Sequence, residues 1–283
     1  MNSNRNSSRG RQEGKKNTPL SRKSKPLARK SPNKTFTKSK ETPKADASSG
    51  IRLNKYIANS GVCSRREADT YIEHGSVEVN GKLVTEMGYK VQPDDVVRFD
   101  GTSITPEEKK YILLNKPKNY ITTMDDPEKR KTVMQLIKGA CDERIYPVGR
   151  LDRNTTGLLL FTNDGEMSQK LTHPSYKIKK IYHVEIDKPL TESHFNQISE
   201  GIKLEDGMVY VNELIALSDD KKSFGVQIHV GKNRIVRRIF EHFDYEVTKL
   251  DRTMYGPLTK KELPKGKWRK LTEKEVIVLK NLS

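Results

Sequence analysis

From residue 53 onward, apolar residues recur at the spacing of an amphipathic helix, and the same pattern starts again at residue 68. Gly61 and Gly75 follow the two runs, at the point where helices commonly end. The second run opens with Ser64-Arg65-Arg66-Glu67, which has the form of a capping box. We therefore predict two short helices whose buried side is formed by Leu53, Tyr56, Ile57, Ala68, Tyr71 and Ile72.

Short strands follow the two helices. Val77-Glu78-Val79 and Leu83-Val84 flank Asn80-Gly81, a strong signal for a β-hairpin. Further strand is predicted at Val91, Val96, Val97 and Phe99. Residues 50–100 are thus expected to form two helices and a small sheet. Residues 101–110, which contain Gly101 and Pro106, are expected to form a linker.

A second and larger set of elements begins at residue 111. Tyr111 to Lys116 predicts a strand that Pro117 ends, and the run Leu158 to Phe161, bounded by turn signals, predicts a buried strand. In the strand predicted at 179–186, alternation places Tyr182 on one face with Val184 and Ile186. Short helices are predicted at 132–137, at 195–202 and after Gly165, in a segment that contains Met167 and Leu171. Strands are predicted at 209–214 and 224–230. A last helix is predicted to bury Ile235, Val236, Ile239 and Phe240.

The charge of the chain narrows the class of partner. Its 283 residues include 54 Lys and Arg against 37 Asp and Glu, a net charge of +17. This excess favours a polyanion, and nucleic acid comes before a membrane because no apolar run approaches spanning length. The amino terminus also lacks the apolar core of a signal peptide. Cys63 and Cys141 lie far apart without metal-ligand spacing, which indicates small side chains in a reducing compartment.

The first 49 residues differ in composition from the rest. They hold 14 Lys or Arg and 3 acidic residues, so 11 of the 17 net charges belong to this segment. Because it has few apolar residues, we predict a disordered basic arm that attracts phosphates without regard to sequence. A solubilising tail and an organellar transit peptide are the alternatives.

Asp152 is the first candidate for chemistry. It lies in a polar, turn-rich run ahead of the predicted strand at 158–161, between Arg150 and Arg153. Each cation favours the ionised carboxylate, so Asp152 is suited to act as a nucleophile or base rather than as a proton donor. The alternative is a turn aspartate that caps local backbone N–H groups.

Arg65 and Arg66 are candidates for binding. They lie in the first turn of a predicted helix, where the positive end of the helix dipole disfavours cations. With Arg52 and Lys55 they are able to form a basic patch that faces RNA phosphates. An ordinary solvated helix face is the alternative.

Several of these segments resemble one known family. Gly149 to Gly165 resembles the active-site motif of the pseudouridine synthases, in the branch that modifies ribosomal RNA, and Arg52 to Val97 resembles an S4 RNA-binding domain. The start of the strand at 111 and the tail from Tyr255 to Arg269 follow the same family, so the resemblance covers residues 50 to about 275. It implies an α+β fold. A small S4 domain at 50–100 would precede a mixed, mostly antiparallel-sheet catalytic domain at 111–283.

The resemblance also implies roles for single residues. Asp152 would be the catalytic carboxylate, Tyr182 in a Lys-x-Tyr segment would stack on the target base, and Arg237 in the motif Gly231 to Phe240 would pair with Asp152. Arg150 would hold the gap left by the flipped base, with a phosphate contact as the alternative. The family more often has a polar residue where this chain has Ile235. The residues implied to contact RNA are Arg52, Lys55, Arg65, Arg66, Arg150, Lys232, Arg234 and Arg238.

These implications lead to one expected function. The chain is expected to be a site-specific ribosomal RNA pseudouridine synthase, most similar to enzymes of the large subunit and therefore acting on 23S RNA. It would bind ribosomal RNA or a ribosomal assembly intermediate, as a cytoplasmic monomer without cofactor or metal. A small-subunit 16S synthase and a non-catalytic ribosome-assembly factor are the alternatives. A glycosidase would need a second carboxylate, and Asp164 lies beyond the predicted strand from Asp152.

Overall fold

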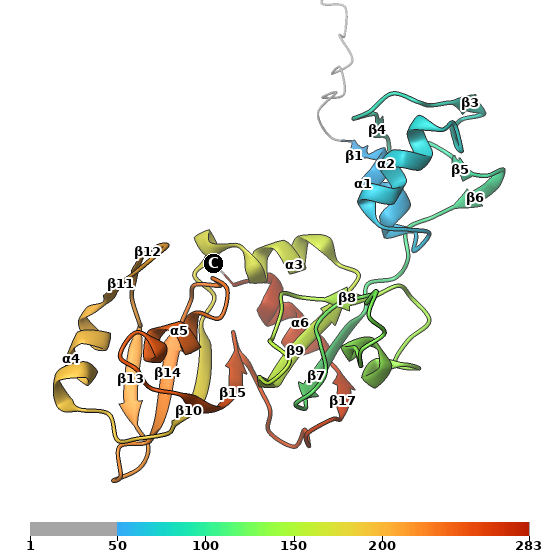
Figure 1. Cartoon of the computed structure of the whole chain (residues 1–283). Coiled ribbons are helices and arrows are strands. Elements are labelled where there is room, and N and C mark those ends of the chain that lie inside the picture. Colours follow the sequence, from blue (N-terminus) through green and yellow to red (C-terminus); the bar gives the residue numbers. More distant parts are fainter. Residues whose placement is uncertain (1–49, 283) are drawn as a thin grey trace, which may run out of the picture. The chain divides into compact units, whose positions relative to one another are not determined.

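The structure is a computed structural model that describes residues 50–282, so the basic arm predicted at 1–49 lies outside the described residues. The described part contains a small amino-terminal domain and a larger carboxy-terminal domain (Figure 1). Within residues 50–282, no helix is both long and apolar enough to cross a membrane.

The amino-terminal domain packs two helices against small sheets, as predicted. Ser64 and Glu67 form the expected capping box, and Asn80 and Gly81 adopt the positive φ angles, 53° and 73°, that a tight hairpin turn requires. Leu53, Ile57, Ala68 and Ile72 lie in its core. The helices are α1 (Leu53–Asn59) and α2 (Arg65–Glu73), the four-stranded sheet has the order β3 (Lys82–Leu83), β2 (Val77–Val79), β5 (Val97–Phe99) and β6 (Thr102–Ile104), and β1 (Ile51–Arg52) pairs with β4 (Lys90–Val91).

Three predictions for this domain are wrong. Tyr71 is exposed rather than buried, and its ring forms a T-shaped pair with Phe99. Val96 is exposed and precedes β5, because its backbone N–H donates to the side chain of Asn80 instead of to a strand. The predicted linker begins with β6, which pairs with β5. A second tight turn at Asp100-Gly101, with φ angles of 44° and 78°, returns the chain to the sheet.

A nine-stranded sheet forms the centre of the carboxy-terminal domain. Its strand pairs are antiparallel, except that β9 and β15 run parallel. The main order is β13 (Glu213–Ala216), β14 (Ser223–Ile228), β10 (Lys180–Ile186), β15 (Val247–Tyr255), β9 (Thr156–Thr162), β7 (Tyr111–Lys116) and β17 (Trp268–Lys270), with β16 (Leu258–Thr259) beside β15 and β8 (Tyr146–Pro147) beside β9. The other elements are η1 (Val133–Ile137), α3 (Gly165–Thr172), η2 (Pro174–Tyr176), α4 (Glu192–Glu200), β11 (Ile202–Leu204), β12 (Gly207–Val209), α5 (Ile235–Glu241) and α6 (Glu273–Lys280).

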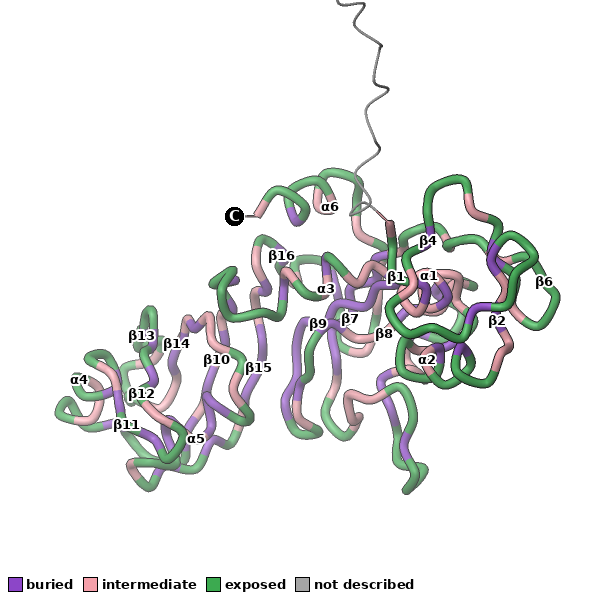
Figure 2. The backbone as a smooth tube through the Cα atoms, turned by 90° about the horizontal axis from the view of Figure 1, so that it is seen from above, coloured by how far each residue is buried: buried purple, intermediate pink, exposed green. Residues whose placement is uncertain are grey.

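Both faces of the central strands are buried, which explains their continuous apolar sequence (Figure 2). In β9, Leu159 and Phe161 point into one core cluster, whereas Leu158 and Leu160 point into another on the opposite face. Helices α4 and α5 contribute to the first cluster, and α3 and α6 contribute to the second. The predicted strands at 111–116, 158–161 and 179–186 are confirmed.

Two boundaries between residues 190 and 230 differ from the prediction. The helix predicted at 195–202 is α4, which begins after its cap Thr191 and ends before Gly201, whose φ is 107°. The single strand predicted at 209–214 is divided between β12 and β13. The chain leaves the β11–β12 hairpin at Val209 and joins the edge of β14, with the backbone N–H of Asn212 bound to Gln227.

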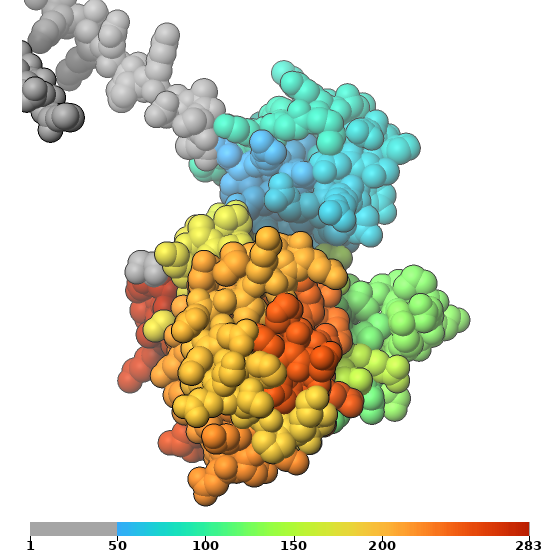
Figure 3. Space-filling view, turned by 60° about the vertical axis from the view of Figure 1, so that its left-hand side comes forward, coloured from blue at the N-terminus to red at the C-terminus, as the bar shows by residue number. Residues whose placement is uncertain are grey.

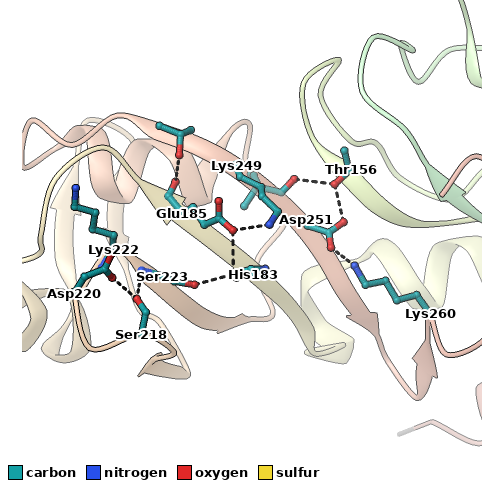
Figure 4. A network of polar contacts seen from close by, with 12 residues as sticks. Thr156, His183, Glu185, Ser218, Asp220, Lys222, Ser223, Lys249, Asp251 and Lys260 are labelled. Carbon is teal, nitrogen blue, oxygen red and sulfur yellow. Dashed lines mark hydrogen bonds and ion pairs between the residues drawn. The ribbon is translucent and has the colours of Figure 1, made fainter. Parts of the chain in front are cut away.

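Polar contacts fix the junction between β9 and β15. Thr156 Oγ1 donates to Asp251 Oδ1 over 2.6 Å, and Lys260 forms an ion pair with the same carboxylate (Figure 4). Next to this network, Gly157 has a φ of 103°, and a Cβ there would overlap the backbone of Arg252. Glycine at position 157 therefore lets the two strands approach closely.

Candidate active site

A pocket of about 150 Å³ opens where the loop before β9, strands β10 and β15 and the beginning of α5 meet. Two of the three predicted catalytic residues, Asp152 and Tyr182, line this pocket, whereas Arg237 does not. The lining residues are Val148, Gly149, Arg150, Leu151, Asp152 and Thr155 from the loop, Thr172, Lys180, Tyr182, Val230, Gly231, Lys232, Arg234, Ile235, Val236, Leu250, Arg252 and Tyr255.

Asp152 lies in the loop that leads into β9, as predicted. It is half-buried, and within residues 50–282 its carboxylate accepts no hydrogen bond and forms no ion pair. Its backbone carbonyl, in contrast, accepts bonds from Thr155 N and from the ammonium group of Lys116. The main chain is therefore held in place, and the carboxylate is left open to the pocket. This contradicts the alternative of a turn aspartate whose side chain caps local N–H groups.

Lys116, at the end of β7, organises this loop. The residue is fully buried, and its Nζ donates to the carbonyl oxygens of Asp152, Arg153 and Thr155 over 3.0, 3.3 and 2.8 Å, and to Pro117 over 3.2 Å. Burial lowers the pKa of Lys116 to about 8, and the Asp152 carboxylate acts in the opposite direction. No role was predicted for Lys116 from the sequence. The available signal was a lysine that continues an apolar strand directly before proline.

The loop has further contacts to the chain that follows β7. Thr122 Oγ1 donates to the carbonyl oxygen of Leu151 over 2.7 Å, and the backbone N–H of Asn119 donates to Arg153 over 2.9 Å. Contacts from several separate residues restrict the loop more tightly than a single contact would. Such a rigid support is what a reacting side chain needs to keep its position.

Tyr182 lies on the buried face of β10 with Val184 and Ile186, as alternation predicts. It belongs to the core cluster and also lines the pocket beside Asp152. Tyr182 is thus both a core residue and a pocket residue, because the pocket opens at the edge of the core. Its neighbour His183 points away and lies near Glu185 and Ser223 (Figure 4).

Arg237 does not form the ion pair that was predicted with Asp152. The residue is buried in α5, and its Nη1 donates to the carbonyl oxygen of Val247 over 2.7 Å, while its Nε has no partner. Burial lowers the pKa of Arg237, as does the neighbouring Arg234, whereas Asp152 opposes the shift. The two predicted partners are thus coupled through space, but the guanidinium is directed toward the beginning of β15.

The predicted RNA-binding cations around α5 are only partly free. Arg238 binds both oxygens of Asp206, over 3.0 and 2.7 Å, and Lys232 lies 3.5 Å from the same carboxylate. The hydrogen bond from Arg238 holds the pKa of Asp206 down at about 2. Arg234 pairs with Glu241. The surface around α5, orange-red in Figure 3, adjoins the yellow and orange segments that supply Asp206. Arg150 is exposed at the pocket and forms no ion pair within the described residues.

The candidates in the amino-terminal domain occupy the predicted positions. Arg65 and Arg66 are exposed in the first turn of α2, and Arg52 is exposed in β1. Lys55 in α1 forms an ion pair with Glu166 over 2.8 Å, so its charge is partly neutralised.

Two buried cations of the pocket were missed by the sequence analysis. Lys180 lies on the same face of β10 as Tyr182, and Arg252 lies opposite Tyr182 on β15. Both occupy positions where the strand pattern calls for apolar residues, and this is the signal that was available. Within residues 50–282, no group of three or more His, Cys, Asp or Glu is placed to hold a metal ion.

Comparison with known proteins gives consistent results. The family profile described as RNA pseudouridylate synthase matches residues 110–242, and the S4 domain profile matches residues 51–97. The chain is 43% identical over 236 residues to "Ribosomal large subunit pseudouridine synthase B" of Bacillus subtilis (strain 168), with 82% of this chain and 96% of the relative covered. It is 39% identical over 235 residues to "Dual-specificity RNA pseudouridine synthase RluF" of Escherichia coli (strain K12), with 82% and 79% covered.

A solved structure is similar as well. A protein described as "Crystal structure of pseudouridylate synthase" superposes with a TM-score of 0.58 at 29% identity, and the match covers 81% of this chain and 99% of that chain. The match to the solved structure covers about the same share of this chain as the matches to the two relatives, 81% against 82%.

Proposed function

The chain belongs to the RNA pseudouridine synthase family, in which an S4 domain precedes the catalytic domain, and we propose that it isomerises a specific uridine of 23S ribosomal RNA with Asp152 as the catalytic carboxylate. The observation that carries the proposal is the Asp152 carboxylate, which has no partner among residues 50–282 and lies in a pocket that Tyr182 and several cations line. The large-subunit assignment is supported by the relative from Bacillus subtilis, whose name states it.

The chemistry explains why one carboxylate is sufficient. Pseudouridine forms when the N1–C1′ bond of uridine breaks, the uracil ring turns and C5 bonds to C1′. The carboxylate of Asp152 either attacks C1′ or removes the C2′ proton, and each route divides a difficult step into easier ones. Lys116 supports both routes, because it holds the backbone of Asp152 while leaving the side chain free.

The target nucleotide must leave its stack before it reaches Asp152. Flipping costs a few kcal/mol, which stacking and cationic contacts offset. Tyr182 supplies the aromatic surface, and Arg150 at the mouth of the pocket fills the gap in the stack or binds a phosphate. Arg237 does not line the pocket, and its charge acts on Asp152 only through space.

The proposal also covers the RNA partner of the protein, its oligomeric state and its cellular location. We propose that the protein acts as a cytoplasmic monomer on ribosomal RNA or on an assembly intermediate. In the S4 domain, Arg52, Arg65 and Arg66 are exposed and suited to RNA phosphates. At the catalytic domain, Lys232, Arg234 and Arg238 contribute less than their number suggests, because acidic residues already pair with them.

The proposal is tested with Asp152→Asn. The amide keeps the shape of the side chain but loses its nucleophilicity and basicity, so turnover is expected to disappear while RNA affinity stays within a few-fold. Pseudouridine mapping in ribosomal RNA from cells that lack the protein identifies the target uridine. Product formation by the variant at the wild-type rate would refute the role of Asp152. If cells that lack the protein instead lose a pseudouridine from the small subunit, the substrate is small-subunit RNA and not 23S RNA.

A further inference from the structure

Two cations of the pocket have no counterion. Lys180 is 7% exposed and Arg252 is 3% exposed, and among residues 50–282 neither forms an ion pair. Removing an ion from water costs several kcal/mol unless a partner compensates. Two such charges side by side also repel each other: burial, together with the charge of Arg252, lowers the pKa of Lys180 to about 8. This arrangement is unfavourable for stability and points to a ligand that carries negative charge.

The guanidinium of Arg252 has a fixed plane. Its Nε donates to the carbonyl oxygen of Leu158 over 2.7 Å, and its Cζ lies 4.5 Å from the centre of the Tyr255 ring. Its Nη2 is buried and has no hydrogen-bond partner in the described part of the chain. Because an unsatisfied buried donor costs about 1–3 kcal/mol, it is expected to have a partner when the pocket is filled.

A hydrogen bond to a backbone carbonyl oxygen also holds the side chain of Lys180. Its Nζ donates to the carbonyl oxygen of His229 over 3.0 Å, which leaves further ammonium protons available. Lys180 and Tyr182 share one face of β10, and Arg252 is the cross-strand neighbour of Tyr182 on β15. The two cations therefore flank the tyrosine on which the base is proposed to stack.

We propose that Lys180 and Arg252 bind the carbonyl oxygens of the flipped uracil and stabilise the negative charge that the ring carries once it is detached from the ribose. This inference rests on the proposed function. The ligand is the base and not a phosphate, because Lys180 and Arg252 are buried beside Tyr182 and Tyr255. The exposed cations suited to phosphates, such as Arg150, lie elsewhere on the pocket lining.

The balance of the reaction requires such charge stabilisation on either route. When the Asp152 carboxylate bonds to C1′, the electron pair of the broken N1–C1′ bond stays on the uracil ring. When Asp152 instead takes the C2′ proton, the C2′–H pair forms a C1′=C2′ double bond and the N1–C1′ pair again stays on the ring. The detached ring is thus an anion in both cases. On the first route the Asp152 carboxylate leaves C1′ as C5 bonds to it, and on the second route C2′ regains its proton from Asp152 as C5 bonds to C1′. The ring is then neutral on both routes, and finally C5 loses its proton while N1 gains one. Cations fixed before the reaction stabilise that charge without reorganisation.

The experiment varies both the protein and the leaving group. Lys180→Met keeps the length of the side chain and removes its charge, and Lys179→Met makes the same change at the exposed neighbouring lysine. Single-turnover rates of N1–C1′ cleavage and RNA affinities are measured for full-length wild type and variants. The readout is the loss of the unchanged target nucleoside after digestion of the RNA, because 5-fluorouridine has no C5 proton to lose and cannot complete the last step. The substrates are the same ribosomal RNA fragment with uridine or with 5-fluorouridine at the target. Fluorine withdraws electron density, so the detached ring carries its charge more easily and needs the lysine less.

We expect Lys180→Met to lower the rate with uridine about 100-fold, with RNA affinity within about threefold. With 5-fluorouridine the loss should shrink to about tenfold or less, and Lys179→Met should match wild type with both substrates. A lysine that only supports the fold would lower both rates equally. If Lys180→Met does not fold, Lys180→Gln tests the same point, because its amide still donates to His229 but carries no charge.

The outcomes separate this inference from the function on which it rests. A wild-type protein that forms no pseudouridine in ribosomal RNA refutes the proposed function. If wild type is active, an equal loss with both substrates, or no loss at all, refutes the inference alone. A weakened RNA affinity with an unchanged rate at saturating RNA also refutes it, because that result assigns the cations to a phosphate.

Discussion

Replacing Lys116 by methionine tests whether the loop that carries Asp152 is held by one buried ammonium group. Methionine has a similar length and is apolar, so the change removes the charge and the donors with little change in volume. Four carbonyl oxygens lie within 2.8 to 3.3 Å of Nζ, three of them in the loop. An ammonium has three protons, so at most three full hydrogen bonds are lost.

The magnitude follows from two opposing effects. Three bonds to a charged donor stabilise the fold by roughly 5–9 kcal/mol at about 1.5–3 kcal/mol each. Burying the charge costs several kcal/mol, and the methionine variant no longer has this cost. We expect a net loss of roughly 2–4 kcal/mol, which lowers the unfolding midpoint by roughly 6–12 °C in a chain of this size. A displacement of Asp152 by about 1 Å is expected to lower the rate about 100-fold.

The assay pairs thermal unfolding with single-turnover release of tritium from C5 of the target uridine, since C5 loses its hydrogen in the reaction. Lys118→Met, two residues further on and exposed, is the matched control and should behave as wild type. RNA affinity of Lys116→Met should stay within a few-fold, because Lys116 does not line the pocket. A variant that keeps both the wild-type midpoint and the wild-type rate would show that the loop does not depend on Lys116.

Three further predictions follow from the same structure. Tyr182→Phe should bind RNA nearly normally, whereas Tyr182→Ala should lose about 1–3 kcal/mol of stacking; unchanged affinity and rate in the alanine variant would return Tyr182 to a purely structural role. Gly157→Ala should lower the unfolding midpoint more than Gly139→Ala, because both have positive φ but only a Cβ at 157 would overlap neighbouring backbone; equal midpoints would contradict this. The catalysed rate should fall as pH rises through about 8, since Lys116 and Lys180 lose their charges there; a pH–rate profile that is flat to about pH 10 would contradict it.

Local patterns predicted most of the elements but few of their partners. The capping box of α2, the Asn80-Gly81 turn and the buried strand β9 depend on residues close in sequence, so each was predicted correctly. The pairing of Arg238 with Asp206 joins residues 32 positions apart. No periodic pattern encodes such a contact, and the expectation of an open basic surface around α5 was therefore incomplete.

In the candidate site, too, features that depend on nearby residues were predictable, and contacts between distant residues were not. The positions of Asp152 in the loop before β9 and of Tyr182 on the buried face of β10 follow from local signatures, a turn-rich run before an apolar strand and a two-residue alternation, and both residues line the pocket. The direction of Arg237 depends on where the beginning of β15 lies relative to α5, which tertiary packing decides. The positions of Lys180 and Arg252 in their strands indicate burial of each residue, but only the sheet order shows that both are buried at one pocket.

The parallel pair of β9 and β15 explains why the pocket lies where it does. It joins two antiparallel groups of strands, β13-β14-β10-β15 and β9-β7-β17. The second group supplies the loop with Asp152, and the first supplies Tyr182 and the two buried cations. The proposed reacting groups from the two sides therefore keep their distances only if this junction is rigid. Thr156 and Asp251 within the sheet, with Lys260 just after β16, fasten the junction outside the pocket lining, so we expect the geometry of the proposed site to depend on contacts that do not line the pocket.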